Sequence, residues 1–284
     1  MRLPLLILGA IAVAALAMPL VALALHSDPS AVDLVNRFAG PSLAHPLGTD
    51  ELGRDMLLRL LEGGRVSLTI GIAAAVAAAA IGTGIGLAAG YLGGWTDRIL
   101  MRFADGVIAL PLLPLLIVLA ALDLGKLGIP GWFAQSPAIS LVRIVVLAVL
   151  VGWTTAARLV RGATLVTRQR DFVRAARSLG ARTFHILWRH ILPNVTAPLV
   201  VATTLSVGDI ILLESVLSFL GLGVQPPLAS WGSMLSNAEE LITSSPLLAI
   251  YPGAMIFLTV IACNLLGDAL LTRFDPRDAL TAGR

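Results

Sequence analysis

The chain has 284 residues, of which 57% are hydrophobic and only 13% are charged, and its mean hydropathy is +0.90. Soluble domains carry about 25% charged residues, so the composition argues against a soluble two-domain enzyme. A disordered chain is excluded because such chains are poor in apolar residues and rich in charge. The formal net charge of +3 matters less than where the charges lie along the chain. The composition predicts an all-α, polytopic membrane protein.

Six long apolar runs predict six transmembrane helices, because a helix needs about 20 apolar residues to cross a bilayer. The runs lie at residues 3–25, 66–92, 99–122, 139–160, 195–213 and 247–271. The first run, preceded only by Arg2, is longer than the ~7–15 residues of a signal-peptide core, which favours a retained helix over a cleaved signal. An even number of spans predicts that both termini lie on one side of the membrane.

The second and third runs carry residues that shape a helix. Gly82, Gly86 and Gly90 follow one another in four-residue steps, and such spacing lets a neighbouring helix approach closely. We interpret them as helix-packing residues. Pro111 and Pro114 predict a kink in the third span, which is either a fixed bend or a gate.

The distribution of arginine predicts the orientation of the spans, because cytoplasmic loops are rich in Lys and Arg. Residues 158–189 contain eight arginines and one acid, Asp171, whereas residues 217–246 contain no lysine or arginine and two acids. We therefore expect residues 158–189 and both termini to be cytoplasmic, and residues 26–64 and 217–246 to be external. Outside the arginine-rich loop, the charged residues that support this orientation include Glu239, Glu240, Arg273, Arg277 and Arg284.

The arginine-rich loop predicts two short amphipathic helices. In the first, between an N-cap at Asp171 and a stop at Gly180, four apolar residues recur at helical spacing. In the second helix an apolar stripe begins again. Pro193 ends this helix and begins the fifth span. The two stripes consist of Phe172, Ala175, Ala176 and Leu179, and of Phe184, Leu187, Trp188 and Ile191.

The first of these helices presents a small, flat apolar face surrounded by Arg174, Arg177 and Arg182. Such a face suits docking into a groove on a partner protein. An arginine-rich helix lying on anionic membrane lipid fits the composition equally well. Nucleic acid is not expected as a partner, since the preference for positive charge on the cytoplasmic side accounts for the arginines.

The same loop, RAARSLGA…RHILPN, resembles the EAA loop of ABC importer inner-membrane subunits, whose pattern is E-A-A, three residues, Gly, nine residues, I-x-L-P. Arg174 stands where that pattern has glutamate, and His190 where it has isoleucine. This form is similar to the dipeptide, oligopeptide and nickel permease branch. Segments 45–71, 214–235 and 257–277 resemble the C-type permease subunit of that branch. The matching loop residues are Ala175, Ala176, Gly180, Leu192 and Pro193.

The resemblance implies a type I ABC importer permease architecture in a bacterial inner membrane. Residues 1–64 would form a first helix and an external segment, and residues 65–284 the permease domain with a coupling loop at 161–194. The implied partners are a homologous permease subunit in a heterodimer, two ABC ATPase subunits and an external substrate-binding protein, and the implied cargo is peptides or nickel chelates. The implied ATPase-coupling residues are Phe172, Arg174, Ala175, Ala176, Arg177, Leu179, Gly180, Ala181, Leu192 and Pro193.

The chain lacks the motifs that would make it an enzyme. A P-loop needs G-x-x-x-x-G-K-[ST], but the single lysine, Lys126, is followed by Leu127. Neither an H-E-x-x-H zinc motif nor a G-x-S-x-G elbow occurs, and the four histidines do not cluster. We therefore expect no catalytic residue, no metal and no cofactor, with ATP hydrolysis on a separate chain.

Two acids in the region of the fifth span, Asp209 and Glu214, are candidates for the translocation path, because ionisable residues at membrane depth mark functional sites by default. They also support an alternative function, an ion-coupled secondary transporter. Their five-residue spacing turns them about 140° apart on a helix, which weakens a paired relay. A structural alternative is a buried hydrogen bond to a neighbouring span or to the external segment.

Overall fold

The computed structural model describes residues 1–122, 130, 136–236 and 245–274, and the regular structure within these ranges is helical. Five of the charged residues named above lie outside the described residues: Lys126, Glu239, Glu240, Arg277 and Arg284. The helices are α1 (Arg2–Leu16), α2 (Met18–Leu25), η1 (Leu34–Asn36), α3 (Met56–Leu92), α4 (Gly94–Ala109), α5 (Leu112–Ala120), α7 (Pro137–Thr167), α8 (Asp171–Ser178), α9 (Thr183–Ile186), η3 (Leu187–Ile191), α10 (Leu192–Phe219), η4 (Ser233–Leu235) and α12 (Leu247–Phe274).

The expected six spans agree with the upper count that the helices allow. Within the described ranges, four helical segments are individually long and apolar enough to cross a bilayer: α3, α7, α12 and the continuous run from Thr183 to Phe219. Two bent pairs raise the count to six, α1 with α2 at 48° and α4 with α5 at 84°. The second bend falls at Pro111, the N-cap of α5, where the prolines predict a kink.

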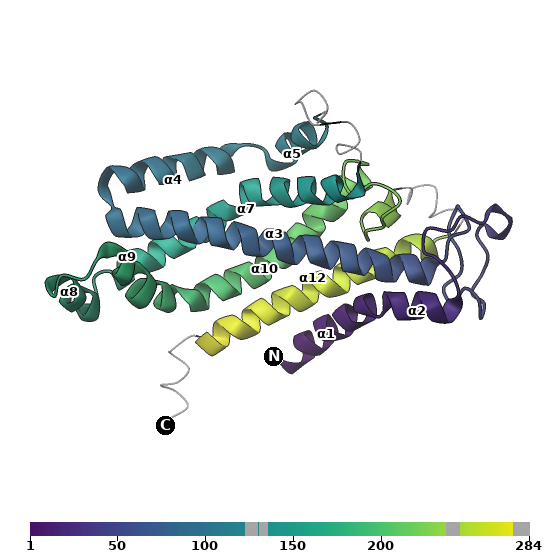
Figure 1. Ribbon diagram of the computed structural model, residues 1–284, viewed down its shortest axis with the longest axis horizontal. Helices are drawn as coiled ribbons and strands as arrows, with labels where there is room; N and C mark the ends of the chain where they lie inside the picture. Colours follow the sequence, from purple (N-terminus) through teal and green to yellow (C-terminus); the bar gives the residue numbers. More distant parts are fainter. Residues whose placement is uncertain (123–129, 131–135, 237–244, 275–284) are drawn as a thin grey trace.

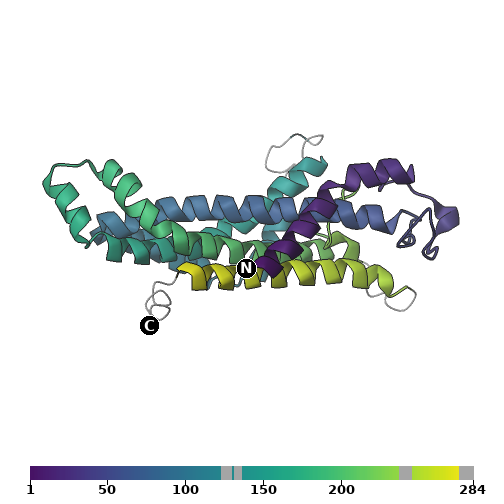
Figure 2. The same ribbon diagram turned by 90° about the horizontal axis from the view of Figure 1, so that it is seen from below.

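The long helices run along one direction and leave loops at the two ends of the bundle (Figure 1). One end, which we call the arginine-rich end, holds α8, α9 and the turn between α3 and α4 (Figure 2). The opposite end, which we call the loop end, holds the loop at residues 26–55 and the segment 220–236. Met1 lies at the last turn of α12, with its Sδ 3.7 Å from Nη1 of Arg273.

Helices α3 and α7 make the most extensive contact in the bundle, and glycines of α3 permit it. A methyl group on Gly82 would lie 2.5 Å from the carbonyl oxygen of Trp153, and one on Gly86 would lie 2.5 Å from that of Ala157. Only glycine, which has no side chain, therefore fits at both positions. The interpretation of these glycines as helix-packing residues is confirmed.

Two helix boundaries differ from those expected. Helix α3 begins at Met56, ten residues before the apolar run, because Oδ1 of Asp55 accepts a hydrogen bond from the amide of Leu58 at 2.9 Å. Pro193 does not separate the second loop helix from the fifth span. It lies in the first turn of α10, where its missing N–H costs little, so the chain stays helical from Thr183 onwards through the π-helix η3.

The close contact between α3 and α7 predicts the effect of adding one methyl group. Gly86→Ala should lower the free energy of unfolding by about 1–3 kcal/mol, the usual cost of overpacking. Gly84→Ala is the matched control, because no atom lies within 4 Å of a methyl group at that position, and its effect should be neutral or stabilising by up to about 1 kcal/mol. Thermal unfolding of both variants in detergent measures the difference. Equal melting temperatures would contradict the assigned contact.

Candidate functional site

At the arginine-rich end, α8 is held to the bundle by one side only. Val173 is 1% exposed and packs in a cluster with Tyr91 of α3 and with Ile186 and Ile191 of the following helical run. Ala176, Ala181 and Leu192, three of the expected coupling residues, pack partly against the same cluster. The cluster therefore ties α8 to the end of α3 and to the beginning of α10.

The opposite side of α8 is apolar but uncovered. Phe172 is 45% exposed, Leu179 is 88% exposed, and Ala175 between them is exposed as well. Arg174 and Arg177 are also exposed, and the guanidinium carbon of Arg177 lies 5.2 Å from the centre of the Tyr91 ring. The apolar stripe expected on this helix exists, and only Ala176 of its four residues is drawn into the bundle.

Only half of the second expected stripe faces the bundle: Ile191 is buried, and Leu187 packs against the cluster around Val173. Phe184 and Trp188 are 70% and 57% exposed, and their rings contact each other at 5.8 Å instead of facing the bundle. The buried residues are Ile186 and Ile191, both 0% exposed. These two residues lie five apart, and the wider turn of the π-helix η3, with its i→i+5 hydrogen bonds, brings them closer to one face than a regular α-helix would.

Arginines fasten the arginine-rich end, a role that the sequence pattern did not indicate. Nη1 of Arg168 donates to the carbonyl oxygen of Gly90 at 2.8 Å, next to the end of α3. Arg161 forms a two-point ion pair with Asp97 of α4, the Nη2–Oδ2 distance being 2.7 Å. Arg158 pairs with Asp105 at 2.6 Å. Three of the eight arginines thus join α7 to the ends of α3 and α4.

The turn after α8 depends on Gly180. Its φ is +79°, in the left-handed region that side-chain-bearing residues adopt only with strain. The amides of Gly180 and Ala181 donate to the carbonyls of Arg177 and Ala176, at 3.0 and 3.1 Å. The expected helix stop at Gly180 is therefore confirmed, whereas the residue preceding the helix is Arg170 and Asp171 is its first residue.

At the loop end, Glu214 is fully buried and joins three segments. Its Oε2 accepts from the hydroxyl of Ser67 on α3 at 3.0 Å, and its Oε1 accepts from the hydroxyl of Ser218 at 2.6 Å. The Ser218 oxygen in turn accepts from the amide of Val224 at 3.1 Å. This arrangement matches the structural alternative considered for Glu214. Asp209 is exposed on another face of α10, so the structure does not bring the two acids together.

Trp231 ties the segment 220–236 to the bundle. A tryptophan in a loop between spans is typical of an interfacial anchor, but this side chain is 0% exposed. Its ring nitrogen donates to the carbonyl of Leu60 at 3.0 Å, and its amide donates to the Ser67 hydroxyl at 3.2 Å. The segment therefore folds back into the bundle, where Gly63 and Gly64 leave space for the indole.

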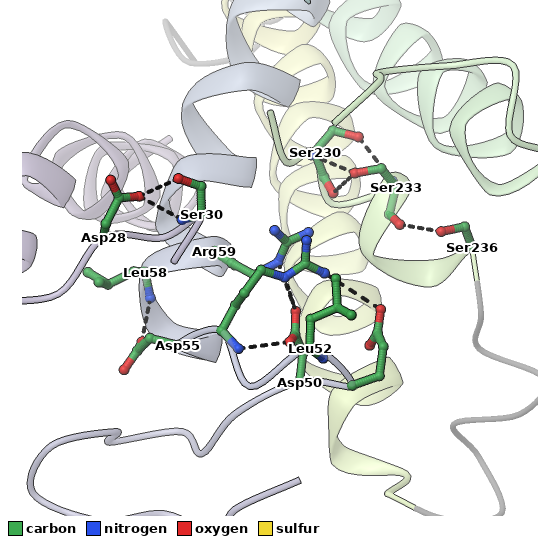
Figure 3. Close-up of polar contacts among 12 residues, drawn as sticks. Asp28, Ser30, Asp50, Leu52, Asp55, Leu58, Arg59, Ser230, Ser233 and Ser236 are labelled. Carbon is green, nitrogen blue, oxygen red and sulfur yellow. Dashed lines mark hydrogen bonds and ion pairs between the residues drawn. The ribbon is translucent and has the colours of Figure 1, made fainter. Parts of the chain in front are cut away.

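The loop at residues 26–55 is ordered by short polar turns. Oδ1 of Asp28 accepts from the hydroxyl and the amide of Ser30 (Figure 3), and these hydrogen bonds lower the pKa of Asp28 below its usual value. Nδ1 of His45 lies 2.9 Å from Oδ2 of Asp55, the residue that caps α3. In the part of the chain that the structure describes, no three His, Cys, Asp or Glu side chains are placed to hold a metal ion.

The chain thus combines an apolar helix bundle with a basic pair of short helices at one end. Residues 80–278 match the family described as binding-protein-dependent transport system inner membrane component, and the chain belongs to this family. It is thus a multi-pass membrane protein of a transport system that works with a binding protein.

Particular relatives narrow the group. The chain is 41% identical over 238 residues to the glutathione transport system permease protein GsiD of Pectobacterium atrosepticum, covering 84% of this chain and 74% of the relative. It is 40% identical over 254 residues to a putative peptide permease protein of Brucella suis, covering 89% and 80%. It is 38% identical over 255 residues to the probable D,D-dipeptide transport system permease protein DdpC of Escherichia coli strain K12, covering 90% and 80%.

The fold is similar to a solved transporter. A chain in a crystal structure of an amino acid ABC transporter with histidines superimposes with a TM-score of 0.51, covering 77% of this chain and 94% of that chain at 17% identity. The likeness supports the type I permease architecture that the loop motif implies.

The buried carboxylate predicts how the loop end is stabilised. Glu214→Ala should leave Ser67 and Ser218 without their acceptor, at a cost of about 1–3 kcal/mol, and should speed amide exchange at Val224 and Trp231. Asp209→Ala on the exposed face of α10 is the control and should not change exchange in residues 220–236. Hydrogen–deuterium exchange with mass spectrometry measures both, and equal protection in the two variants would rule out the anchoring role.

Proposed function

We propose that this chain is the permease subunit of an ATP-driven importer, that it pairs with a homologous six-span permease to form one translocation path, and that its cargo is a peptide or a related small solute. Two separate ABC ATPase subunits would supply the energy, and an external binding protein would deliver the solute. The observation that carries the proposal is the uncovered apolar face of α8, on a chain of this family, at the basic end of the bundle.

The arrangement of charge supports the orientation proposed for the subunit. Seven of the eight arginines of residues 158–189 lie on the last turns of α7, on α8 or in the turns around it, and the eighth lies on η3. Positive charge favours the cytoplasmic side, so the arginine-rich end would be cytoplasmic and the loop end external. Met1 and the last turn of α12 lie together, which fits two termini on one side, and we place that side in the cytoplasm.

The coupling surface that we propose has an inner and an outer part. The outer part, Phe172, Ala175 and Leu179, would dock into a groove on the ATPase, as amphipathic helices dock through an exposed apolar stripe. Arg174 and Arg177 would flank it. The inner part consists of Ala176, Ala181 and Leu192, with Pro193 at the start of α10. Its three apolar residues pack on the cluster around Val173, so the inner part would transmit the movement of α8.

This geometry suggests how ATP binding changes the membrane helices. Closure of the ATPase pair would shift α8, and the cluster that joins Val173 to Tyr91 and Ile191 would pass the shift to α3 and α10. The subunit would then move between inward-open and outward-open populations, because the ATP-bound ATPases hold one of the two states more tightly. Gly180 would fix the angle between α8 and the run that continues into α10.

The relatives support the cargo class. Their names specify glutathione, peptide and D,D-dipeptide transport, so we favour peptides over nickel chelates.

The functional division at residue 64, with a first helix and external segment before it and the permease domain 65–284 after it, falls inside the continuous helix α3. An ion-coupled transporter acting through Asp209 or Glu214 has less support, since Glu214 engages both carboxylate oxygens with serines.

A charge placed on the outer face of α8 should prevent assembly with the ATPase. Leu179→Asp or Ala175→Glu should weaken recovery of the ATPase subunits with the purified permease by at least about tenfold, because an apolar anchor at an interface contributes roughly 2 kcal/mol or more. Ser178→Glu, which adds a charge to the same helix outside the apolar stripe, should retain the ATPase. Unchanged recovery with the two stripe variants would contradict the docking surface.

A side chain at Gly180 should separate ATP hydrolysis from transport. Gly180→Val forces a β-branched residue into a φ of +79°, at a cost of about 1–3 kcal/mol that the chain relieves by changing the angle of α8. We expect normal membrane insertion, retained ATP hydrolysis and peptide uptake reduced by about tenfold. Gly162→Val, at a helical glycine with no atom within 4 Å of an added methyl group, is the control. Full uptake by Gly180→Val in proteoliposomes would contradict the lever.

A further inference from the structure

The arginine-rich end contains a hollow that is lined by positive charge only. Its volume is about 420 Å³, and it lies between the last turn of α3, the residues that follow α7, and α8. Within the described ranges, none of its three arginines forms an ion pair. The residues that line the hollow are Tyr91, Leu92, Arg168, Gln169, Arg174 and Arg177.

Two of the three arginines are fixed against the end of α3. Nη1 of Arg168 donates to the carbonyl oxygens of Gly90 and Tyr91, at 2.8 and 3.3 Å. The guanidinium carbon of Arg177 lies 5.2 Å from the centre of the Tyr91 ring. The third, Arg174, is exposed on α8. An anion bound between these groups would therefore join α8 to the ends of α3 and α7.

Arg177 lies on the side of α8 opposite the stripe that we propose for the ATPase. A helix turns about 100° per residue, which places Arg177 about 140–160° from each of the three stripe residues. An ATPase docked on the stripe would leave the Arg177 side uncovered, and this side faces Tyr91 at the end of α3. The hollow is therefore suited to an occupant other than the docked ATPase.

The apolar surface next to the hollow indicates the level of the membrane interface. Leu92 lines the hollow and is exposed, and Trp95, three residues further along the chain, is 72% exposed. Tryptophan is enriched at the level of the lipid headgroups. From Trp95 an exposed apolar stripe continues along α4 through Ile99 and Phe103. The hollow thus lies where the apolar surface of the bundle ends.

These features select the phosphate group of a lipid. Guanidinium groups bind phosphate oxygens through strong, charge-assisted hydrogen bonds, and basic residues at the membrane surface attract anionic lipids. The guanidinium carbon of Arg98 lies 4.7 Å from the centre of the Trp95 ring and adds positive charge beside the stripe of α4. A carboxylate of a protein partner would match the charge of the hollow, but only acyl chains would also cover the neighbouring apolar stripe.

We propose that the hollow lined by Arg168, Arg174 and Arg177 binds the headgroup phosphate of an anionic phospholipid, whose acyl chains cover the exposed stripe of α4. The lipid joins α8 to the ends of α3 and α7 and so limits the movement of α8 relative to the bundle. The binding site does not depend on the proposed function. Its assignment to the cytoplasmic leaflet does, because the proposed function sets the orientation of the chain.

The test uses the full-length chain, with the subunits that purify with it, in nanodiscs of equal parts dioleoyl phosphatidylglycerol and dioleoyl phosphatidylcholine. A benzophenone amino acid at Leu92 crosslinks to the occupant of the hollow, and mass spectrometry of the crosslinked peptide identifies it. We expect phosphatidylglycerol to exceed phosphatidylcholine by about tenfold. Equal crosslinking of the two lipids, or crosslinking to a protein subunit instead of lipid, would overturn the proposal.

Paired variants separate the hollow from the general basic charge of this end. Arg174→Gln with Arg177→Gln should bring the ratio of the two lipids close to one, whereas the two lysine substitutions should keep most of the preference because the charges remain. Arg182→Gln with Arg189→Gln removes two exposed arginines outside the hollow and should keep the wild-type ratio. Equal loss in the two glutamine pairs would assign the preference to diffuse attraction and overturn the site.

Inorganic phosphate distinguishes a lipid headgroup from a soluble anion. Added at constant ionic strength, it should leave the ratio of the two lipids unchanged, because the acyl chains keep the headgroup at the hollow. A ratio that falls to one with phosphate would assign the hollow to a soluble anion and overturn the proposal. The docking stripe of α8 lies on the other side of the helix, so these outcomes are distinguishable from a failure of ATPase docking.

Discussion

The close contact of α3 with α7 is the constraint on which the rest of the structure depends. Gly82 and Gly86 bring the two backbones so near that a single methyl group would meet a carbonyl oxygen. Between apolar helices in lipid, the hydrophobic effect gives little attraction, so association relies on such close packing and on hydrogen bonds. The long pair α3–α7 reaches from one end of the bundle to the other (Figure 1), and both candidate functional regions are attached to it.

The two ends are attached by different interactions, and the difference suits different tasks. At the loop end, a buried carboxylate and serines hold the segment 220–236 against α3, and Trp231 fills the space over Gly63 and Gly64. Directional hydrogen bonds among buried groups specify one arrangement. At the arginine-rich end, an apolar cluster around Val173 and a few arginine contacts hold α8, whose outer face stays uncovered. One end is thus held in a single arrangement, whereas the other leaves an apolar face of α8 exposed.

The sequence predicted the elements whose signals are local. The apolar runs gave the spans, Pro111 gave the bend between α4 and α5, and Gly180 gave the end of α8. The second loop stripe was right at Ile191 but wrong at Phe184 and Trp188, because the π-helix changes which residues align, and the spacing of these residues does not reveal it. The burial of Trp231 could not be predicted, because its hydrogen-bond partners lie more than 150 residues away in the chain.

The burial of Arg59 beside Asp50 was not predictable for the same reason. In the sequence, Arg59 is an ordinary charge just before an apolar run, and its pairing with Asp50, which also pairs with Arg54, follows only from the folded loop. The coupling residues that we propose were easier to locate, since α8 leaves Phe172, Ala175 and Leu179 of the predicted stripe exposed. A motif can therefore indicate a candidate docking helix, whereas a cavity between the distant segments 50–59 and 224–236 is visible only in the folded chain.

In the proposed importer, the arginine-rich end contacts the ATPase and the loop end does not. Photo-crosslinking in membranes that contain the complete importer tests it directly, with a benzophenone amino acid placed either at Leu179 or at Leu43, which are 88% and 99% exposed. The account predicts that the probe at position 179 crosslinks to the ATPase and that the probe at position 43 does not. Crosslinking of the ATPase from position 43, or its absence from position 179 in an importer that still hydrolyses ATP, would contradict the account.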